Sequence, residues 1–587
     1  MQTAAAGRNG VHQLNRLMGI LALTISTGMA APEPILVLKH SDVVFMYQAP
    51  KGVYDTYGAT VLAWGGTPTA KALEEASGLK FFGSVGMVTE FARYYERFPE
   101  TYERGLCRNL KGEPFKVPWL TDHQHKGVPF WWCCTRQPVF RQYISERVVE
   151  TIKAGSEGVH IDDHLGTAGA LFIEGGCFCA QCVSEFRDYL KSLSAPELTG
   201  NGVRDASRLD YADVLRKWLA EKSGRKVADH PLWNRWRTYQ LRGAAAFMNE
   251  LRTLAARTAG KPIPMSANAC LMWGPHLSDY LTLDYFSAEI EHHAAAKVFS
   301  DEPLAAYRIA EAVNRPLAAT ASGGDWAFVK ENNLPGLVQS WVALSYAAGQ
   351  SLMAPHRQWC YTPQKGTHWY EGPSQKFAPL YRFVRRNASL FDGYATFPDL
   401  IVAYAQLTFD RDRARFATVC HRLAAANLSF RLALGGDEAV EHALSAEDFR
   451  GTAPVLVLEP GDFQPADKAY LASLPPSRKV EDLEAALAKV TPAVRAASAG
   501  QLRVLPRVKP GSAIIHLVNW NYDATRDAVE PVKQVRLNPD LRALGVPTAQ
   551  QARVFAPGAA AVTVQIKENA LTVPEVGLWA IVELNAD

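Results

Sequence analysis

Two apolar runs in the sequence end in acidic residues, at points where a buried strand would reach the edge of a sheet. The first run ends in Asp162 and Asp163, and the second contains Glu289 and is followed by Glu291. Paired carboxyl groups can cleave a glycosidic bond, because one protonates the leaving oxygen while the other attacks carbon or activates water. Side chains alternate along a strand, so Asp162 and Asp163 point in opposite directions. We expect Asp162 and Glu289 to form the reacting pair.

Each acidic residue also has a structural interpretation, because an Asp or Glu after a strand can cap the helix that follows. For Asp163 and Glu291 this interpretation is as good as a role at the site. Nearby histidines suggest a third chemistry, that of a metal-dependent hydrolase, provided that four imidazole rings converge. These histidines are His160, His164, His292 and His293.

Other side chains at the predicted strand ends suit substrate binding. Asn268 can hydrogen-bond a sugar hydroxyl, and the rings of Trp326 and Trp359 can stack on a sugar face. As single residues they suit loop packing equally well. The expected substrate-binding residues are Asp163, His164, Asn268, Glu291, Asp325, Trp326, His356 and Trp359.

Three cysteines within six residues form the sharpest local motif, Cys177-Phe-Cys179-Ala-Gln-Cys182. Three thiolates at this spacing can hold one tetrahedral zinc ion, and a fourth ligand is needed to close a structural site. Cys133 and Cys134 are both candidates for that ligand. Disulfides or buried free thiols are the alternatives, and export would permit disulfides. Because four thiolates leave no position for a reactive water, we expect the zinc to be structural.

The candidate catalytic and binding residues can form one site only if the fold brings the ends of their strands together. Between residues 33 and 393, short apolar runs alternate with helix-period stretches such as 140–154, 235–259 and 334–348. This alternation predicts a parallel sheet with crossover helices, and eight units predict a (β/α)8 TIM barrel. The predicted strands are 59–64, 79–87, 128–133, 157–162, 263–269, 283–290, 316–321 and 350–355. The run 43–47 is either a rim strand or the true first strand.

The remainder of the chain has a different pattern. Residues 395–495 alternate strand and helix over a shorter length, which predicts a small α/β, flavodoxin-like domain. Between 496 and 587, short alternating strands are separated by Gly, Pro and Asn, as in a β-sandwich. With the barrel at 32–394, the sequence predicts an α/β protein of three domains.

Composition narrows the class of protein without identifying a substrate. A chain of 587 residues with 48% hydrophobic residues can fold as several globular domains. Its 62 Lys and Arg nearly balance 59 Asp and Glu, so the net charge of +3 argues against a nucleic-acid partner. Aromatic residues make up 10% of the chain, which large cores explain as well as sugar binding does.

Residues 1–31 have the features of a secretory signal peptide. Arg8 and Arg16 precede an apolar run, and small residues lead to Pro32. The run is short for a membrane span, which needs about 20 apolar residues, and no other segment is apolar enough. We therefore expect a periplasmic or secreted protein, with a disordered leader as the alternative interpretation.

The order of several motifs resembles the barrel of glycoside hydrolase family 42 β-galactosidases and of related bacterial glycosyl hydrolase-like proteins. The matching segments are 134–143 (CTRQPVFRQY), 158–162 (GVHID) and the cysteine motif followed by Phe186. The resemblance implies the same order of domains, with the small α/β domain used for trimerisation. It also implies structural zinc bound by Cys134, Cys177, Cys179 and Cys182.

The catalytic positions depart from family 42. That family carries its acid/base as an Asn-Glu pair at the end of strand four, where this chain has two aspartates, and its nucleophile as a Glu at the end of strand seven, which this chain lacks. The sole Asn-Glu pair here, Asn249-Glu250, lies in a predicted helix. The Gly-x-x-x-Asp pattern at 158–162 instead resembles the nucleophile strand of α-amylase and α-galactosidase barrels. That resemblance implies Asp162 as nucleophile and Glu289 as acid/base on an α-linked sugar.

The sequence thus predicts an exported glycoside hydrolase with structural zinc that acts on an oligo- or polysaccharide. The alternative is a non-catalytic carbohydrate-binding barrel, a degenerate glycosidase that keeps its aromatic residues as a sugar-docking surface. Turnover of a glycoside that depends on Asp162 and Glu289 would separate the two hypotheses.

Overall fold

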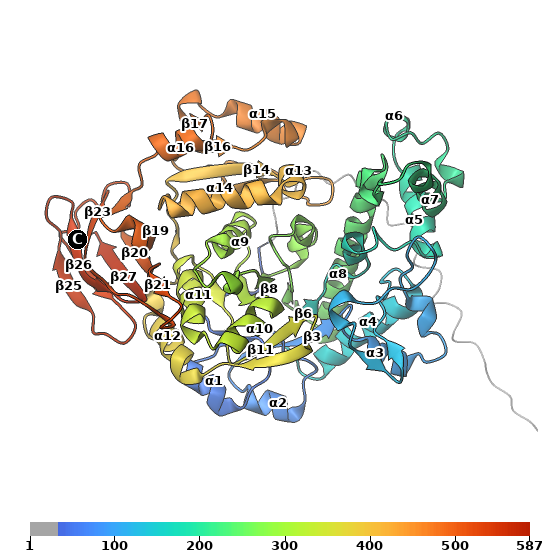
Figure 1. The fold of residues 1–587 in the computed structure, drawn as a ribbon, viewed down its shortest axis with the longest axis horizontal. Coiled ribbons are helices and arrows are strands. Elements are labelled where there is room, and N and C mark those ends of the chain that lie inside the picture. Colours follow the sequence, from blue (N-terminus) through green and yellow to red (C-terminus); the bar gives the residue numbers. More distant parts are fainter. Residues whose placement is uncertain (1–32, 587) are drawn as a thin grey trace, which may run out of the picture. The chain divides into compact units, whose positions relative to one another are not determined.

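Eight parallel strands form the central sheet of the computed structural model, which describes residues 33–586 (Figure 1). In sheet order they are β1 (Val44–Phe45), β2 (Val61–Leu62), β3 (Lys80–Gly86), β6 (Gly158–Asp162), β7 (Met265–Ala267), β8 (Tyr285–Ile290), β9 (Leu317–Ala321) and β10 (Ser351–Leu352). The N–H of Ala354, just after β10, donates to the carbonyl oxygen of Val44 over 2.8 Å. The sheet is therefore nearly closed, and the predicted (β/α)8 barrel is confirmed.

The run 43–47 supplies the first strand of the barrel, whereas the run 128–133 supplies no strand to the barrel. Only the first two residues of the latter form a strand, β5 (Val128–Pro129), which pairs antiparallel with β4 (Gln124–His125). The third strand predicted at 128–133 was wrong, because an apolar run also suits a loop packed against the barrel, where Trp132 is buried. One barrel strand was added at 43–47 and one was removed at 128–133, so the segment 157–162 is still the fourth strand of the barrel.

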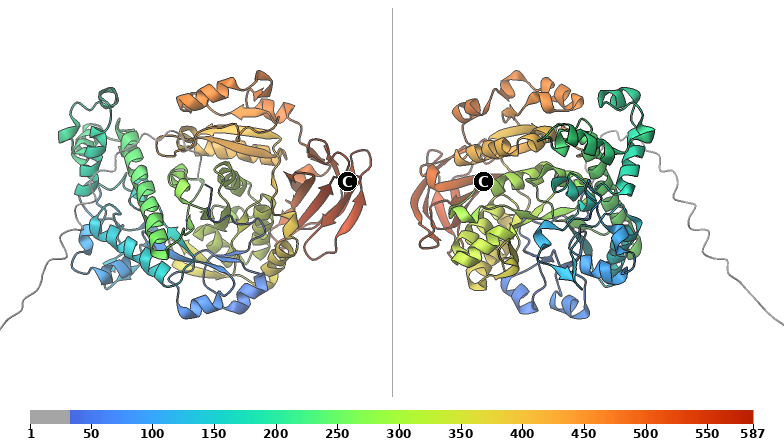
Figure 2. Two further views of the ribbon diagram at one scale, coloured as in Figure 1. Left: turned by 180° about the vertical axis from the view of Figure 1, so that it is seen from behind. Right: turned by 45° about the vertical axis from the view of Figure 1, so that its right-hand side comes forward.

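Helices follow the strands around the barrel (Figures 1 and 2). They are α1 (Lys51–Tyr57), α2 (Ala70–Glu75), α3 (Phe91–Arg97), α4 (Pro138–Lys153), α8 (Trp233–Ala259), α9 (Glu302–Ala312), α10 (Gly323–Asn332), α11 (Pro335–Ala347) and α12 (Ser374–Arg386). The helix-period stretches predicted from the sequence coincide with α4, α8 and α11. Pro138 opens α4, where its missing N–H costs no hydrogen bond, and Gly260 ends α8 with a left-handed φ of 68°.

Two aromatic rings identify the inward face of the strands. Phe82 of β3 and Tyr285 of β8 have ring centroids 5.4 Å apart, although the two strands are not neighbours in the sheet. Gly158 leaves room for this contact, because a Cβ atom there would lie 2.4 Å from the Phe82 ring. Side chains alternate along a strand, so Asp162 and Glu289 share the inward face with Gly158 and Tyr285.

A long excursion separates β6 from β7 in the chain. After the short 3-10 helix η3 (Gly166–Phe172) it contains α5 (Ala180–Lys191), α6 (Ala195–Gly200) and α7 (Tyr211–Glu221) before α8 begins. The cysteine motif lies at the start of α5. The loop that follows the fourth strand therefore carries the cysteines as well as Asp163 and His164.

A second, four-stranded parallel sheet has the order β15-β14-β16-β17. Its strands are β14 (Leu400–Ala405), β15 (Phe430–Gly435), β16 (Val455–Val457) and β17 (Lys479–Val480), and its helices are α13 (Gln406–Arg411), α14 (Arg413–Ala425), α15 (Pro465–Ser473) and α16 (Leu483–Lys489). The order places the first strand between the second and the third, as in flavodoxin-like folds. This agrees with the predicted small α/β unit.

The C-terminal residues, together with one short strand that directly follows the barrel, form two antiparallel sheets. One has the order β13 (Ala395–Thr396), β19 (Leu502–Lys509), β20 (Ser512–Asn519), β27 (Trp579–Asn585), β24 (Gln551–Phe555) and β25 (Val562–Gln565), and the other β18 (Val494–Ala496), β23 (Val532–Pro539) and β26 (Leu571–Val576). Leu517 from the first sheet and Val535 from the second share one hydrophobic core. Two sheets packed over a common core form the predicted β-sandwich.

The three-domain division at 32–394, 395–495 and 496–587 stays a prediction, because the described residues group as one compact unit. The predicted signal peptide at 1–31 lies outside the described residues. Within the described part of the chain, no helix is long and apolar enough to cross a membrane.

Candidate active site at the barrel mouth

A single asparagine connects the two predicted catalytic carboxyl residues. Asn268 follows β7, between the strands that carry Asp162 and Glu289. Its Nδ2 donates to Oδ1 of Asp162 over 3.2 Å, and its Oδ1 accepts the backbone N–H of Glu289 over 3.2 Å. All three side chains are partly exposed at the carboxyl ends of β6, β7 and β8, where barrel enzymes carry out their chemistry.

The two carboxyl groups have different electrostatic surroundings. Burial raises the pKa of Glu289 to about 8, and the negative charges of Asp162 and Glu291 add to this effect. Burial also raises the pKa of Asp162, but the hydrogen bonds from Asn268 and the Asp163 N–H and the charge of His164 oppose the rise. One carboxyl group favours the protonated form and its neighbour has partners that favour ionisation, as acid–base pairs require.

Asp163 is held in an unusual backbone conformation beside this pair. Its φ angle is 52°, in the left-handed region that non-glycine residues adopt at a cost of about 1–3 kcal/mol. Its Oδ2 atom is buried without a hydrogen-bond partner among the described residues. Burial, followed by the charges of Asp162 and Glu289, raises its pKa well above the usual range. Asp163 is therefore a third acidic group at the same mouth.

His164 is turned into the protein rather than toward the mouth. Its ring is fully buried, with Nδ1 2.7 Å from Oδ2 of Asp279 and Nε2 3.1 Å from Nδ1 of His276. With both nitrogens engaged, the ring has no atom to offer a substrate. The structure gives His164 protein partners instead of the predicted substrate contact.

Aromatic residues that the sequence did not single out form a cluster beyond the first two strands. Burial, followed by the charges of Glu289 and Asp162, raises the pKa of Tyr47, so its hydroxyl stays protonated. The Tyr47 ring stacks on Trp64 at 6.1 Å and meets Trp369 edge-on at 5.2 Å. Tyr47 and Trp64 follow the first two strands, so recognising 43–47 as the first strand would have found Tyr47.

Trp359 and Trp369 lie on one face of a hairpin beyond β10. The hairpin pairs β11 (Arg357–Thr362) with β12 (Gly366–Glu371), and Trp359 is directly opposite Trp369. Both rings are partly exposed, and Trp359 stacks on Tyr361 at 5.8 Å. This face could contact a sugar. His356, which precedes the hairpin, is also partly exposed.

The side chains of Trp326 and Asp325 are buried in contacts with other parts of the protein and are not open to a substrate. Trp326 is 1% exposed, donates from Nε1 to Oγ1 of Thr320 over 3.0 Å and stacks on another ring. Asp325 accepts the backbone N–H groups of His292 and Ala294, each over 2.7 Å. These contacts hold the loop that follows Glu289. Glu291, in that loop, is exposed and accepts a hydrogen bond from Ser322.

The four histidines proposed as metal ligands do not converge. His160 contacts Oγ of Ser266 at 3.0 Å inside the barrel, while Nδ1 of His292 donates to the carbonyl oxygen of Ile290. His293 pairs with Glu302 outside. Across residues 33–586, the cysteines are the one group of three or more potential ligands close enough to share an ion. The structure gives no support to a histidine metal site.

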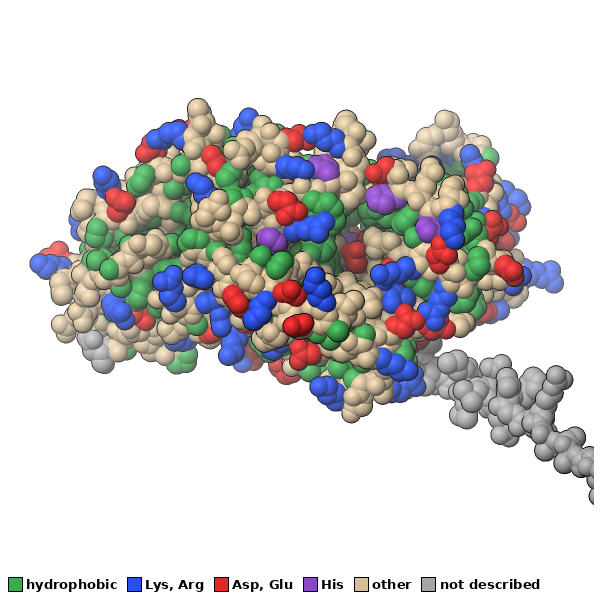
Figure 3. All heavy atoms as spheres, turned by 90° about the horizontal axis from the view of Figure 1, so that it is seen from below, with side chains coloured by type: hydrophobic (Ala, Val, Ile, Leu, Met, Phe, Trp, Pro, Cys, Tyr) green, Lys and Arg blue, Asp and Glu red, His purple; other side chains and the backbone are tan. Residues whose placement is uncertain are grey.

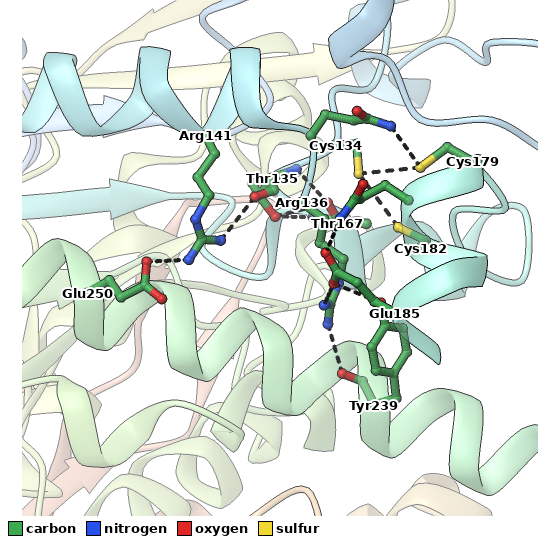
Figure 4. A network of polar contacts seen from close by, with 12 residues as sticks. Cys134, Thr135, Arg136, Arg141, Thr167, Cys179, Cys182, Glu185, Tyr239 and Glu250 are labelled. Carbon is green, nitrogen blue, oxygen red and sulfur yellow. Dashed lines mark hydrogen bonds and ion pairs between the residues drawn. The ribbon is translucent and has the colours of Figure 1, made fainter. Parts of the chain in front are cut away.

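Four buried cysteines form that group. The ligand atoms of Cys134, Cys177, Cys179 and Cys182 all lie within 4.8 Å of one another. Figure 4 shows three of these residues, Cys134, Cys179 and Cys182. Sγ of Cys134 is 3.9 Å from Sγ of Cys179 and 3.6 Å from Sγ of Cys182, which fits four sulfurs about 2.3 Å from a tetrahedral zinc ion. These sulfurs are too far apart for disulfide bonds, and all nine cysteines are free thiols. The residues present therefore fit a metal ion.

Side chains around the cysteines attach the segment that precedes α4 to helix α5. Nε2 of Gln137 donates to Sγ of Cys179 over 3.3 Å, and Arg136 pairs with Glu185 of α5 (Figure 4). Cys133 points elsewhere, toward the carbonyl oxygen of Trp131. Because adjacent residues point in opposite directions, Cys134 and not Cys133 joins the cluster. The cluster ties the loop after β6 to the loop after β3.

The charged side chains on the face shown in Figure 3 are mixed in sign, with Lys and Arg interspersed among Asp and Glu. That face carries no large patch of one sign. A protein attracts a strongly charged polymer over long range through such a patch, so this face has no feature that would attract a strongly charged polymer.

Comparison with known proteins gives one distant sequence relative and many structural ones. No family model matches the chain. An "Alpha-agarase" from Alteromonas agarilytica is 21% identical over 438 residues, which are 67% of this chain and 29% of that protein. The chain thus matches less than a third of the length of this curated relative.

Solved structures of glycoside hydrolases share the fold over most of the chain. An α-L-fucosidase from Paenibacillus thiaminolyticus has a TM-score of 0.58 and 12% identity, covering 94% of this chain and all of that one. A β-galactosidase from Bacillus circulans sp. alkalophilus has a TM-score of 0.60 and 11% identity, covering 93% and 99%. A GH42 β-galactosidase from G. stearothermophilus has a TM-score of 0.55 and 10% identity, covering 94% and 100%. The protein therefore has the barrel fold of these glycoside hydrolase structures.

Proposed function

We propose that this protein is an exported glycoside hydrolase that cleaves an α-linked glycosidic bond in an oligo- or polysaccharide. The observation that carries the proposal is the hydrogen-bonded unit of Asp162, Asn268 and Glu289 at the barrel mouth. The fold of the fucosidase and galactosidase structures and the relative called an agarase are consistent with it.

Glu289 is the proposed general acid. Its raised pKa, about 8, leaves it protonated near neutral pH, so it can give its proton to the glycosidic oxygen as the carbon–oxygen bond breaks. Asp162 is the proposed second group. As a carboxylate it attacks the anomeric carbon, or removes a proton from the attacking water, while Asn268 holds its Oδ1 in place.

The cysteine cluster is proposed to hold structural zinc. Four thiolates fill the tetrahedral shell, so the ion would supply no open position for water and would act by fixing loops. Cys134 belongs to the loop after β3, and the other three ligands belong to the loop after Asp162. The proposed zinc would therefore hold the backbone that carries Asp162 and Asp163.

Turnover by matched variants tests the proposal. Wild type, Asp162→Asn, Glu289→Gln and the control Glu250→Gln are assayed on agar and on aryl α-galactosides, β-galactosides and α-fucosides. Glu250 is 60% exposed on α8 and pairs with Arg141 of α4. We expect each of the two site variants to lose at least about 100-fold in kcat/KM, with the control unchanged.

Activity that survives both substitutions would refute the assignment of these two residues. Saccharide binding in calorimetry without any product, for the wild type across the same panel, would instead identify a non-catalytic carbohydrate-binding barrel. The partly exposed Trp359 and Trp369 are the rings that such a protein would offer to a sugar.

A further inference from the structure

Two exposed aromatic side chains contact each other on loops that follow the strands of the proposed active site. Phe172 belongs to the loop after β6, which begins with Asp163, and Trp273 belongs to the loop after β7, which begins with Asn268. Each of the two residues is 44% exposed, and within residues 33–586 they are the aromatic members among the exposed large hydrophobic residues. Their ring centroids are 5.5 Å apart. We call this pair the aromatic corner.

The aromatic corner has hydrogen-bond donors beside it. The planes of its two rings are at 87° to each other, so the rings form two sides of a corner and do not stack. The guanidinium carbon of Arg413 lies 4.7 Å from the centroid of the Trp273 ring, and Nη1 of Arg413 donates to the carbonyl oxygen of Met272 over 3.3 Å. Arg413 is the first residue of α14 in the small α/β unit, and it is exposed.

Backbone hydrogen bonds hold both aromatic residues in fixed turns. Three N–H groups just after Phe172 donate to the carbonyl oxygen of Ala170, over 3.0 to 3.2 Å. Trp273 donates its own N–H to the carbonyl oxygen of Cys270 over 2.8 Å and accepts the N–H of His276 over 2.9 Å. Because these segments are already ordered, a ligand that binds to the two rings costs the protein little conformational entropy.

The length of the chain places the aromatic corner within reach of a polymer bound at the carboxyl pair. Trp273 is five residues after Asn268. Their Cα atoms are therefore at most about 18 Å apart, the length of five fully extended residues. Asn268 in turn donates to Oδ1 of Asp162 over 3.2 Å. A polymer extends over many sugar units, so units beyond the cleaved bond can reach the two rings.

Aromatic rings beside hydrogen-bond donors suit a saccharide as the ligand. The C–H groups on the face of a sugar ring pack against an aromatic ring, and the hydroxyl groups around its edge accept hydrogen bonds from groups such as the Arg413 guanidinium. Singly exposed apolar residues are common on protein surfaces and need no explanation. Adjacent exposed rings with a polar residue beside them indicate a binding surface instead.

We propose that the aromatic corner, together with Arg413, is a glycan-binding surface that holds sugar units of a polymeric substrate away from the cleaved bond. The proposal rests on the proposed function, because it extends the substrate site of the same barrel mouth. It makes the substrate a polysaccharide or a long oligosaccharide. It also gives the small α/β unit a part in binding, through the first residue of α14.

The first experiment measures binding without turnover. Glu289→Gln, which lacks the proposed acid, is run in native polyacrylamide gels that contain agarose or galactomannan at increasing concentrations. We expect at least one polysaccharide to retard this protein, and added Trp273→Ala or Phe172→Ala to weaken the apparent affinity at least about tenfold. Val562→Ala is the matched control, because Val562 is also 44% exposed but lies on β25 of the β-sandwich. It should leave the retardation unchanged.

Two further variants of Trp273 separate ring stacking from a structural role. Trp273→Tyr keeps an aromatic face and should keep most of the retardation. Trp273→Leu keeps an apolar side chain without that face and should lose retardation as Trp273→Ala does. Should Trp273→Ala fail to fold, Trp273→Leu and Phe172→Ala carry the test. Retardation of Trp273→Leu equal to that of its Glu289→Gln parent would overturn the proposal.

The second experiment compares a polymer with a short substrate. Values of kcat/KM are measured with the polysaccharide and with the aryl glycoside that the wild type hydrolyses. Binding energy from distant sugar units is available only with the polymer. We therefore expect the ratio of kcat/KM on the polymer to kcat/KM on the aryl glycoside to fall at least about tenfold in Trp273→Ala. Val562→Ala should keep the wild-type ratio.

The outcomes distinguish failure of this proposal from failure of the proposed function. Retardation that depends on Trp273, in a wild type that hydrolyses no glycoside, would refute the proposed function and support glycan binding alone. Activity that depends on Glu289, with the retardation and the kcat/KM ratio unchanged in Trp273→Ala, would overturn the glycan-binding surface alone. Absence of retardation in both gels would also overturn it.

Sedimentation velocity tests a second copy of this chain as the group that covers the two rings. A wild type that is dimeric, and a Trp273→Ala that is monomeric with unchanged retardation, would assign the rings to contact between copies. That result would overturn the proposal. We expect the same sedimentation coefficient for both proteins.

Discussion

Asn268 donates a hydrogen bond from Nδ2 to Oδ1 of Asp162 over 3.2 Å. Through its Oδ1 the same amide accepts the backbone N–H of Glu289, also over 3.2 Å. One side chain thus sets the position of both carboxyl-bearing residues from the strand between them. The link ties the orientation of the proposed nucleophile to the strand that carries the proposed acid.

Replacement of Asn268 tests this link. In Asn268→Ala, Asp162 loses a hydrogen bond that favours its ionised form, so its pKa rises. We expect kcat/KM at pH 6 to fall by at least about tenfold and the acidic limb to move to higher pH. Steady-state kinetics across pH checks this, with Asn249→Ala on α8 as control. A change confined to KM would show that Asn268 only contacts substrate.

The basic limb of the pH profile should respond to Glu291. Its negative charge contributes to the raised pKa of Glu289, after burial and Asp162. Glu291→Gln removes that charge, so the pKa of Glu289 falls and the acid loses its proton at lower pH. We expect the basic limb, near pH 8 in the wild type, to move down by about half a pH unit to one unit in kcat/KM profiles. A basic limb that moves upward would contradict the assignment of Glu289 as the acid.

Ionisation of Glu289 should lower the stability of the folded protein at alkaline pH. In the folded state its pKa is about 8, against about 4.3 in an unfolded chain, so between these values only the folded state keeps the proton. The free energy of unfolding contributed by this group therefore falls as pH rises through that window. Glu289→Gln cannot ionise, and its Tm at pH 8 should exceed that of the wild type by about 1–3 °C.

Calorimetric melts at pH 4 and pH 8 measure this difference. At pH 4 the carboxyl is protonated in the native state, and the two proteins should melt within about 1 °C of each other. The exposed Glu250→Gln serves as control at both pH values. Equal melting temperatures at pH 8 would mean that the environment of Glu289 does not disfavour its charge.

Adjacent cysteines provide a matched pair for testing the metal site. Cys134→Ser removes a ligand, so we expect bound zinc to fall from about one per chain to well below that, with a lower Tm. Cys133→Ser changes a buried thiol outside the cluster and should keep the metal. Elemental analysis of the purified proteins measures the content. Retention of metal in Cys134→Ser would exclude Cys134 as a ligand.

Local pattern was sufficient to predict much of the architecture. Strand runs such as 157–162 and 283–290 depend on the alternation and burial of neighbouring side chains, and both appear in the barrel within a few residues of the prediction. The same reasoning placed Asp162 and Glu289 at strand ends. It failed at 128–133, because hydrophobicity alone does not distinguish a buried strand from a buried loop.

Contacts between distant segments were beyond such reasoning. Trp326 and Trp359 are equivalent as sequence signals, yet one ring is enclosed by packing and the other is partly exposed on a hairpin. Likewise, the partner of His164 is Asp279, more than a hundred residues later in the chain. Which residues meet depends on how loops from different strands pack together.

The sequence by itself determined the barrel pattern, the acidic strand ends and the cysteine spacing, since each is a property of residues close together in the chain. Only the tertiary structure selected Cys134 over Cys133, joined Asp162 to Glu289 through Asn268, and buried His164 against Asp279. The physical reason is that barrel closure brings the ends of separate strands to one mouth. Distances across that mouth depend on the whole fold, and the local periodicity of the sequence does not predict them.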